Sequence, residues 1–165
     1  MIRPFRPSDA DAVSSVVRTT MRVSNAADYP IDQLTPLIQY FSPEKVAALA
    51  TERICLVAES DGQVVATAAL DGCELVTFFV LPTYQGQRIG ASLLEALEAI
   101  APTVGCRRLL VHASRTGVAF YERHGYLRTG TVRNPSVNEQ IELAKDLAPA
   151  SDALAGPQPG RGAMP

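Results

Sequence analysis

Apolar residues recur every three or four positions through the first third of the chain, which is typical of helices that pack one face on a core. Pro4 keeps the segment before them at the edge of a sheet, because proline cannot donate to a central ladder. Ser42 and Pro43 form an N-cap followed by a first-turn proline, which marks the start of a short helix. The pattern predicts an edge strand at 2–6, a helix that follows a capping-box-like segment at 8–11 and ends near 22, a polar loop at 24–30, a helix over 31–41 and a short helix over 43–49.

From residue 54 onward short apolar runs replace the helical period, and two Asp-Gly pairs separate them. Asp61–Gly62 and Asp71–Gly72 are typical of tight hairpin turns, so the three runs around them are predicted to form an antiparallel meander. A strand, helix, strand succession follows, which implies a right-handed crossover and a locally parallel strand pair. The predicted elements are strands at 54–59, 63–70, 73–81, 108–113, 126–133 and 138–144 and helices at 86–101 and 116–123.

These elements predict an α+β fold in three layers, a mixed and mostly antiparallel sheet of about seven strands flanked by helices on both faces. With 165 residues, of which 47% are hydrophobic and 19% charged, the chain suits one globular domain. We place that domain at residues 1–147. A flexible tail is predicted at 148–165, where Pro, Gly and Ala dominate without a period.

Charge and cysteine content narrow the function classes. A net charge of −2 provides no field that would attract nucleic acid or an anionic membrane. No apolar run approaches the roughly 20 residues of a membrane helix and the amino terminus lacks a signal-peptide core, so we expect a cytoplasmic protein. The three cysteines, Cys55, Cys73 and Cys106, lack the spacing of metal ligands; we expect buried free thiols and no bound metal.

Chemistry is most expected between Phe78 and Ala91, where a strand passes through a loop into an amphipathic helix. Gly86 and Gly90 stand at the beginning and end of that loop. The first turn of a helix presents unpaired N–H groups and a partial positive charge, and glycine lets an anion approach the backbone, so the segment predicts an anion site. It matches neither the Walker loop nor the dinucleotide fingerprint, and an ordinary strand-to-helix turn is the alternative.

This segment resembles the cofactor signature of the GNAT superfamily of N-acetyltransferases, Gln/Arg-x-x-Gly-x-Gly/Ala after a strand that ends Val-x-Pro. Here Val80 and Pro82 precede the run 85–90, in which Arg88 stands where the family usually has its first glycine. A second run, 114–126, is similar to the family's Asn-x-x-Ala-x-x-Phe-Tyr-Glu-x-x-Gly-Phe/Tyr pattern, with serine and glycine in place of the asparagine and alanine. The two motifs occur in the family's order, and the resemblance covers roughly residues 2–147.

The resemblance implies a GNAT-like fold in which acetyl-CoA, as acyl donor, lies in a cleft where the strand 73–81 separates from the strand 108–113. The pantetheine arm would hydrogen-bond along the first of these strands, and the pyrophosphate would bind the loop amides. The implied activity is acetyl transfer to a primary amine of a small molecule, a peptide amino terminus or a lysine, by direct attack in a ternary complex. The implied cofactor-binding residues are Phe78, Phe79, Val80, Gln85, Gly86, Gln87, Arg88, Ile89, Gly90, Ala91 and Ser114.

The same resemblance assigns catalytic roles to two side chains. Tyr121 lies at the position of the family's general-acid tyrosine, and a phenol stays protonated at neutral pH and can donate to the CoA sulfur. Glu74 matches a glutamate that some members carry and is the candidate base, and strand alternation predicts that it shares a face with Phe78 and Val80. A water chain that relays the proton, or a solvated glutamate at the start of a strand, is the alternative. A strand amide near Phe78 or Val80 would stabilise the oxyanion.

Asp28 and Tyr29 lie in the loop that commonly walls the acceptor site in this family and are the implied substrate contacts, with an ordinary turn as the alternative. We expect His112, in an apolar strand, to be a packing residue and His124 to interact with helix C-terminal carbonyls.

Two alternative functions, from other classes of protein, remain open. A non-catalytic acyl-CoA-binding or regulatory module of the same fold is favoured by the departures at Arg88 and Ser114. A phosphoryl-transfer protein could use the same anion loop. Dimers are common in families of this kind, so a homodimer is compatible with the reading.

Overall fold

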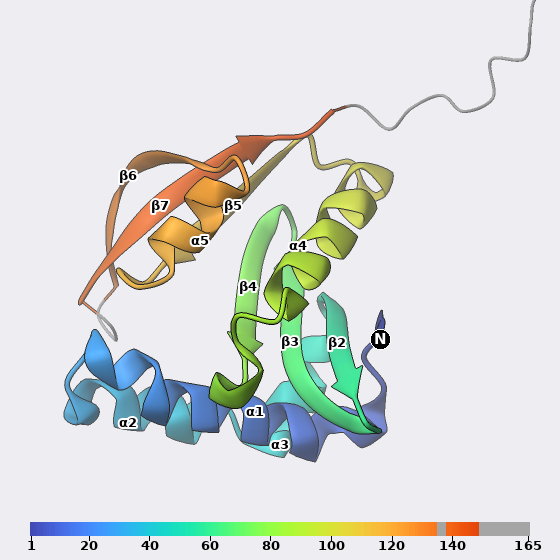
Figure 1. Cartoon of the computed structure of the whole chain (residues 1–165), viewed down its shortest axis with the longest axis vertical. Coiled ribbons are helices and arrows are strands. Elements are labelled where there is room, and N and C mark those ends of the chain that lie inside the picture. The colour runs from blue at the N-terminus through green and yellow to red at the C-terminus, as the bar shows by residue number, and fades with distance from the viewer. Residues whose placement is uncertain (135–137, 149–165) are drawn as a thin grey trace, which may run out of the picture.

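The computed structural model describes residues 1–134 and 138–148, so the tail predicted at 148–165 lies outside the described residues except for its first position. Seven strands form one mixed sheet in the order β1-β2-β3-β4-β5-β7-β6 (Figure 1). The strands are β1 Ile2–Pro4, β2 Ile54–Ser60, β3 Gln63–Asp71, β4 Glu74–Val80, β5 Arg108–Ala113, β6 Leu127–Asn134 and β7 Asn138–Asp146. The α-helices are α1 Ala10–Val23, α2 Ile31–Tyr40, α3 Pro43–Ala50, α4 Ile89–Ile100 and α5 Val118–Arg123.

Helices cover both faces of the sheet, which confirms the predicted three-layer α+β class. On one face, α4 and α5 bury the larger apolar cluster, to which Leu93 and Leu97 contribute. On the other face, α1, α2 and α3 bury a second cluster around Val17 and Leu34. The predicted edge strand, both hairpin turns and all five helices are present. No helix in the described part of the chain is both long and apolar enough to cross a membrane.

The sheet divides at its one parallel junction. β4 pairs with β5 only through Glu74↔Leu110 and Leu75↔Val111, whereas every other strand pair is antiparallel. Beyond these two pairs β4 continues beside β3 and β5 continues beside β7, so the two halves of the sheet separate (Figure 1). The strands separate at the place where the resemblance implied a cleft, and a cavity lined by residues of both strands lies there.

A β-bulge in β4 reverses which of its side chains face each side of the sheet. Thr77 has a φ of +51°, and the register with β3 shifts between Thr67 and Ala69. The extra residue flips the side-chain alternation, as any one-residue slip in a strand does. Phe78 and Val80 therefore pack on the α4 side, and the prediction that Glu74 shares their face is wrong.

The start of α4 differs from the prediction. The helix begins at Ile89 rather than at residue 86, because Gly86 and Arg88 both have positive φ values, +76° and +62°, and form a turn. The left-handed region costs a residue with a side chain about 1–2 kcal/mol, which explains why glycine is usual at the position of Arg88 in the family that this loop resembles.

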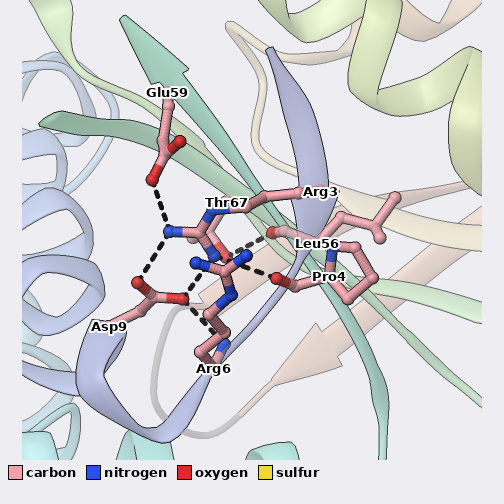
Figure 2. Close-up of polar contacts among 7 residues, drawn as sticks. All are labelled: Arg3, Pro4, Arg6, Asp9, Leu56, Glu59 and Thr67. Atoms are coloured by element: carbon pink, nitrogen blue, oxygen red, sulfur yellow. Dashed lines mark hydrogen bonds and ion pairs between the residues drawn. The ribbon is translucent and has the colours of Figure 1, made fainter. Parts of the chain in front are cut away.

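The predicted capping box at residues 8–11 does not form. The N-cap of α1 makes no side-chain hydrogen bond, and the carboxylate of Asp9 instead accepts from the backbone N–H of Arg6 at 2.7 Å. Asp9 also accepts two bonds from the guanidinium of Arg3, which reaches Glu59 of β2 as well (Figure 2). Asp9 therefore links β1 to the start of α1 through an ion pair.

The cysteine prediction is wrong for two of the three residues. Cys73 and Cys106 form a disulfide with a Cα–Cα distance of 5.5 Å, and only Cys55 is a free thiol. Cys73 immediately precedes β4 and Cys106 lies just ahead of β5. Because β4 and β5 are parallel neighbours, their starting ends meet, and the disulfide joins the two halves of the sheet where the cleft begins.

Candidate active site

One cavity of about 1140 Å³ opens where β4 and β5 separate. It is lined by β4, β5, the loops that follow these strands, α5, α1 and the α1–α2 segment. This cavity brings together most of the residues implied by the sequence. Those that line it are Tyr29, Glu74, Phe78, Phe79, Val80, Gln85, Gly86, Arg88, Gly90, Ala91, Ser114 and Tyr121.

The loop before α4 presents free backbone donors. Within the described residues, the first intrahelical bond at this end runs from Ser92 N–H to the Arg88 carbonyl at 3.0 Å. Among the residues that the structure describes, the amides of 86–91 have no backbone acceptor, as expected for the first turn of a helix. Free amides at the positive end of a helix dipole are groups that bind phosphate or pyrophosphate in proteins.

Gln85 braces this loop. Its amide already donates to the Pro82 carbonyl at 3.3 Å, and its side-chain nitrogen donates to Ser24 and to the Val80 carbonyl. The run of free donors therefore begins at Gly86, one residue later than the sequence implied. Gln85 lines the cavity while it joins the end of β4 to the end of α1.

Gly90 provides room at the start of α4. A Cβ at this position would stand 3.4 Å from the ring of Phe120 and 3.7 Å from that of Phe78. The glycine thus lets the first turn of α4 lie directly against an aromatic pair whose centroids are 5.6 Å apart. A methyl group fits this space at ordinary contact distance, whereas a branched side chain overlaps the rings.

Tyr121 lies in the wall of the cavity formed by α5. Its side chain is 6% exposed and packs edge-on against Phe78 and Tyr126 at centroid distances of 5.9 and 5.6 Å. Burial raises the pKa of Tyr121 above its ordinary value. The phenol therefore keeps its proton across the physiological range and is available as a donor.

Glu74 does not stand alone in the cavity. Its Oε1 lies 2.8 Å from Nδ1 of His112, and Nε2 of His112 lies 3.2 Å from Oε2 of Glu142. Hydrogen bonds from Thr129 and His112, in that order of importance, lower the pKa of Glu142. The expectation that His112 is a packing residue missed both partners. His112 sits on the face opposite Val111, and both His112 and Glu74 line the cavity.

The α1–α2 segment closes the far side of the cavity. Tyr29 is 7% exposed, and its hydroxyl is buried without a hydrogen-bond partner among the described residues. Burial, followed by the charge of Asp28, raises the pKa of Tyr29. Asp28 itself does not line the cavity, because its carboxylate accepts from the amide and hydroxyl of Thr116 at 3.2 and 2.7 Å. These bonds hold the α1–α2 segment against the loop after β5.

Three of the implied site residues lie outside the cavity wall: Asp28, Gln87 and Ile89. Gln87 donates to the Thr83 carbonyl, and Ile89 packs against the core under α4. The wall also contains residues that the sequence did not single out for the site, among them Thr20, Met21, His112, Thr116, Arg123 and Gln140. His124, as expected, bonds a helix carbonyl, that of Phe120 at 2.7 Å.

Charge is distributed unevenly along the cavity. Arg88 at the start of α4, beside the free amides, and Arg123 at the end of α5 both line the cavity. Glu74, at the other end of β4, faces His112. The part bounded by α1 and α2 is mostly apolar, with Met21, Leu34, Leu37, Phe41 and Phe79 in its wall.

The divided sheet, the helix N-terminus with free amides beside the division and the phenol in the cavity wall are the features that the resemblance to acetyltransferases implied. In agreement, residues 51–128 match the family model described as an acetyltransferase (GNAT) domain. The segment from β2 to α5 is therefore similar to GNAT acetyltransferase domains.

Similar proteins agree with this assignment. A GCN5-related N-acetyltransferase from Rhodopseudomonas palustris is 26% identical, covers 89% of this chain and 95% of its own, and superposes with a TM-score of 0.81. The PaiA N-acetyltransferase from Thermoplasma acidophilum, whose structure is a complex with coenzyme A, is 21% identical with a TM-score of 0.79 over 88% of this chain and 98% of its own. An amino-acid acetyltransferase from Azotobacter vinelandii is 35% identical over 91 residues. These residues make up 52% of this chain but only 21% of that protein.

Proposed function

We propose that this protein transfers an acetyl group from acetyl-CoA to a primary amine by direct attack within a ternary complex. One observation carries the proposal: a single cavity contains the free amides before α4, the bulged strand β4 and the buried phenol of Tyr121. A pyrophosphate on the amides would place the pantetheine arm along β4, and the thioester would then lie near the bulge and Tyr121.

Each step of the reaction has a group in this cavity. The amine nitrogen forms a bond to the thioester carbon, and the bulge at Thr77 offers a strand amide to the developing oxyanion. The C–S bond then breaks, and the thiolate takes the phenolic proton of Tyr121. The acceptor enters as an ammonium ion and loses two protons as the amide forms. One goes toward Glu74 and the other restores the phenol of Tyr121, so the overall reaction releases one proton.

The charges and apolar surfaces of the cavity favour a particular class of acceptor. The basic residues lie near the predicted phosphate seat, whereas the acceptor side presents the carboxylate of Glu74 and apolar side chains from α1 and α2. A cationic primary amine with an apolar body suits this arrangement. An acceptor with a carboxylate beside its amine would bring two negative charges together at Glu74, so such acceptors are disfavoured.

Release of free CoA thiol over a panel of amines tests the proposal. We expect turnover with acetyl-CoA and apolar amines. Y121F should lower kcat by about 10- to 1000-fold with little change in CoA affinity, because the phenol acts only as the thiolate leaves. G90V should instead weaken CoA binding, since a branched side chain overlaps Phe120 and displaces the first turn of α4.

The same experiment separates the non-catalytic module from the enzyme. The left-handed backbone of Arg88, where the loop carries a side chain beside the phosphate seat, is the observation that favours a module. Stabilisation by acetyl-CoA without thiol release for any amine supports that alternative. Stabilisation by Mg-ATP but not by CoA overturns both readings.

A further inference from the structure

Four strands place polar side chains in one continuous row on the sheet face opposite α4 and α5. Glu74 of β4 contacts His112 of β5 at 2.8 Å, and His112 contacts Glu142 of β7 at 3.2 Å. Thr129 of β6 donates to the other oxygen of Glu142 at 2.6 Å. Glu74 and His112 line the cavity, whereas Glu142 and Thr129 do not. The row therefore leads from the cavity toward the outer strands of the sheet.

The two contacts of His112 require protons. A ring nitrogen lone pair and a carboxylate oxygen repel one another at hydrogen-bond distance unless a proton lies between them. Both contacts are made at once only when Glu74, His112 and Glu142 share two protons, which leaves the trio with a net charge of −1. With one proton the trio has a charge of −2 and can accept another.

We propose, on the basis of the acetyl transfer proposed above, that His112 stores the proton released by the acceptor amine and passes it to Glu142. The neutral ring starts with its proton on Nε2. The ammonium proton moves to Glu74 and the ring takes up a proton at Nδ1, which gives the two-proton state. The ring then loses its other proton from Nε2 to Glu142, from which solvent removes it. Exchange with solvent of the Nδ1 proton for one on Nε2 returns the ring to its starting tautomer. One proton enters for each amide bond formed and one leaves, which balances the single proton that the reaction produces. Glu142 and Thr129 are positioning residues in this scheme.

The surroundings of His112 favour this role over a purely structural one. The charged or titratable groups nearest to it among the described residues are Glu74 and Glu142, with Arg108 on the same face of β5 and Tyr29 in the cavity wall. The residues of α1 and α2 in the cavity wall carry no charge, and Asp28 is held by Thr116. The side chains of Glu74, His112 and Glu142 are 27–38% exposed, so water reaches the row.

Variants of the row test the proposal through the pH dependence of turnover. E142Q keeps the size of the side chain and can still contact His112 but removes the charge that draws the proton outward. We expect kcat in E142Q to fall about 10-fold and the acidic limb of its pH profile to move to lower pH, while the KM for acetyl-CoA is unchanged. H112Q should lower kcat by about 100-fold. E139Q, the same change on β7 three residues from Glu142, is the matched control and should retain the wild-type profile.

Spectroscopy provides a measurement that is independent of the acceptor. The chain has two histidines, so ¹⁵N–¹H spectra contain two ring systems that H112Q assigns. In E142Q the signal of the His112 Nε2 proton should exchange faster with water, while the His124 signals stay in place. An unchanged pH profile and unchanged His112 signals in folded E142Q overturn the relay. If the wild type releases no thiol with any amine while the spectra change as expected, the proposed function fails and the proton row stands.

Discussion

Two clusters in this molecule each place a nitrogen-containing side chain between two carboxylates, and they differ in whether the nitrogen group can lose its proton. Arg3 lies between Asp9 and Glu59, at 2.7–2.8 Å from the former and 2.5 Å from the latter (Figure 2). A guanidinium stays charged at every pH that the protein meets. This cluster can therefore fix three elements, β1, the start of α1 and β2, but it cannot move a proton.

The cluster in the cavity has the same arrangement of groups, but its central side chain can gain and lose a proton. His112 lies between Glu74 and Glu142, and imidazole is the side chain that changes charge near neutral pH. Arg3 is only 11% exposed in its side chain, whereas His112 is 27% exposed and lines the cavity. Two carboxylate partners therefore do not by themselves determine what the side chain between them does. The identity of the central group and its access to a cavity do.

Loss of the Arg3 charge should have the largest effect, and that effect should be on stability. R3M leaves the Asp9 carboxylate, 8% exposed, without its bidentate partner. Removal of one partner from a buried ion pair is expected to lower the free energy of unfolding by about 3 kcal/mol. Urea unfolding at pH 7 measures the loss. R6M, at an exposed arginine nearby, should change stability by less than about 0.5 kcal/mol, and equal effects of the two variants would contradict the structural role.

A second variant gives the cavity cluster a permanent cation like that of Arg3. It tests whether His112 must be able to exchange a proton. In H112R a guanidinium can still contact Glu74 and Glu142, but it cannot accept a proton. We expect kcat to fall by about 100-fold, which corresponds to about 2.7 kcal/mol, while the melting temperature stays near that of the wild type. Turnover and thermal melts on the same preparation provide both values. Wild-type turnover in H112R would remove the distinction between the clusters.

The Arg3 cluster should also determine how stability responds to acid. Hydrogen bonds from Arg3 are the main cause that lowers the pKa of both Asp9 and Glu59 below their ordinary values. Carboxyl groups of this kind stabilise the fold fully above their unfolded-state pKa values, about 3.9 and 4.3, and that contribution is lost as the pH falls through the lower folded-state values. The stability difference between wild type and R3M should therefore shrink between pH 5 and pH 2. A difference that grows in acid would contradict the assigned cause.

Much of the fold could be predicted because its signals are local. The turn at Asp61–Gly62 has positive φ at both residues, as its sequence indicates, and Ser42 accepts from the Lys45 amide as the N-cap of α3. The strand, loop and helix succession from β4 to α4 was predicted from its apolar runs and glycines. Each of these features depends on residues within a few positions of one another.

The features that the sequence missed depend on pairing between distant residues. His112 meets Glu142 because the antiparallel register of β5 and β7 places them opposite one another. The disulfide forms because two parallel strands begin side by side, and the face of Glu74 was predicted wrongly because one bulge reverses the alternation. Register and bulges are set by the whole sheet, so periodicity along one strand does not reveal them.

The smallest expected effect concerns Arg88, whose charge lies near the phosphate seat rather than in either cluster. R88G removes a side chain from a left-handed position and should raise the free energy of unfolding by about 1 kcal/mol. The same change removes a cation beside the free amides, so CoA should bind about 5-fold more weakly at low salt, and the difference should fade as salt increases. Calorimetry at two salt concentrations separates these effects. Tighter CoA binding by R88G would mean that the Arg88 side chain obstructs the loop, and its charge would then make no net contribution to cofactor binding.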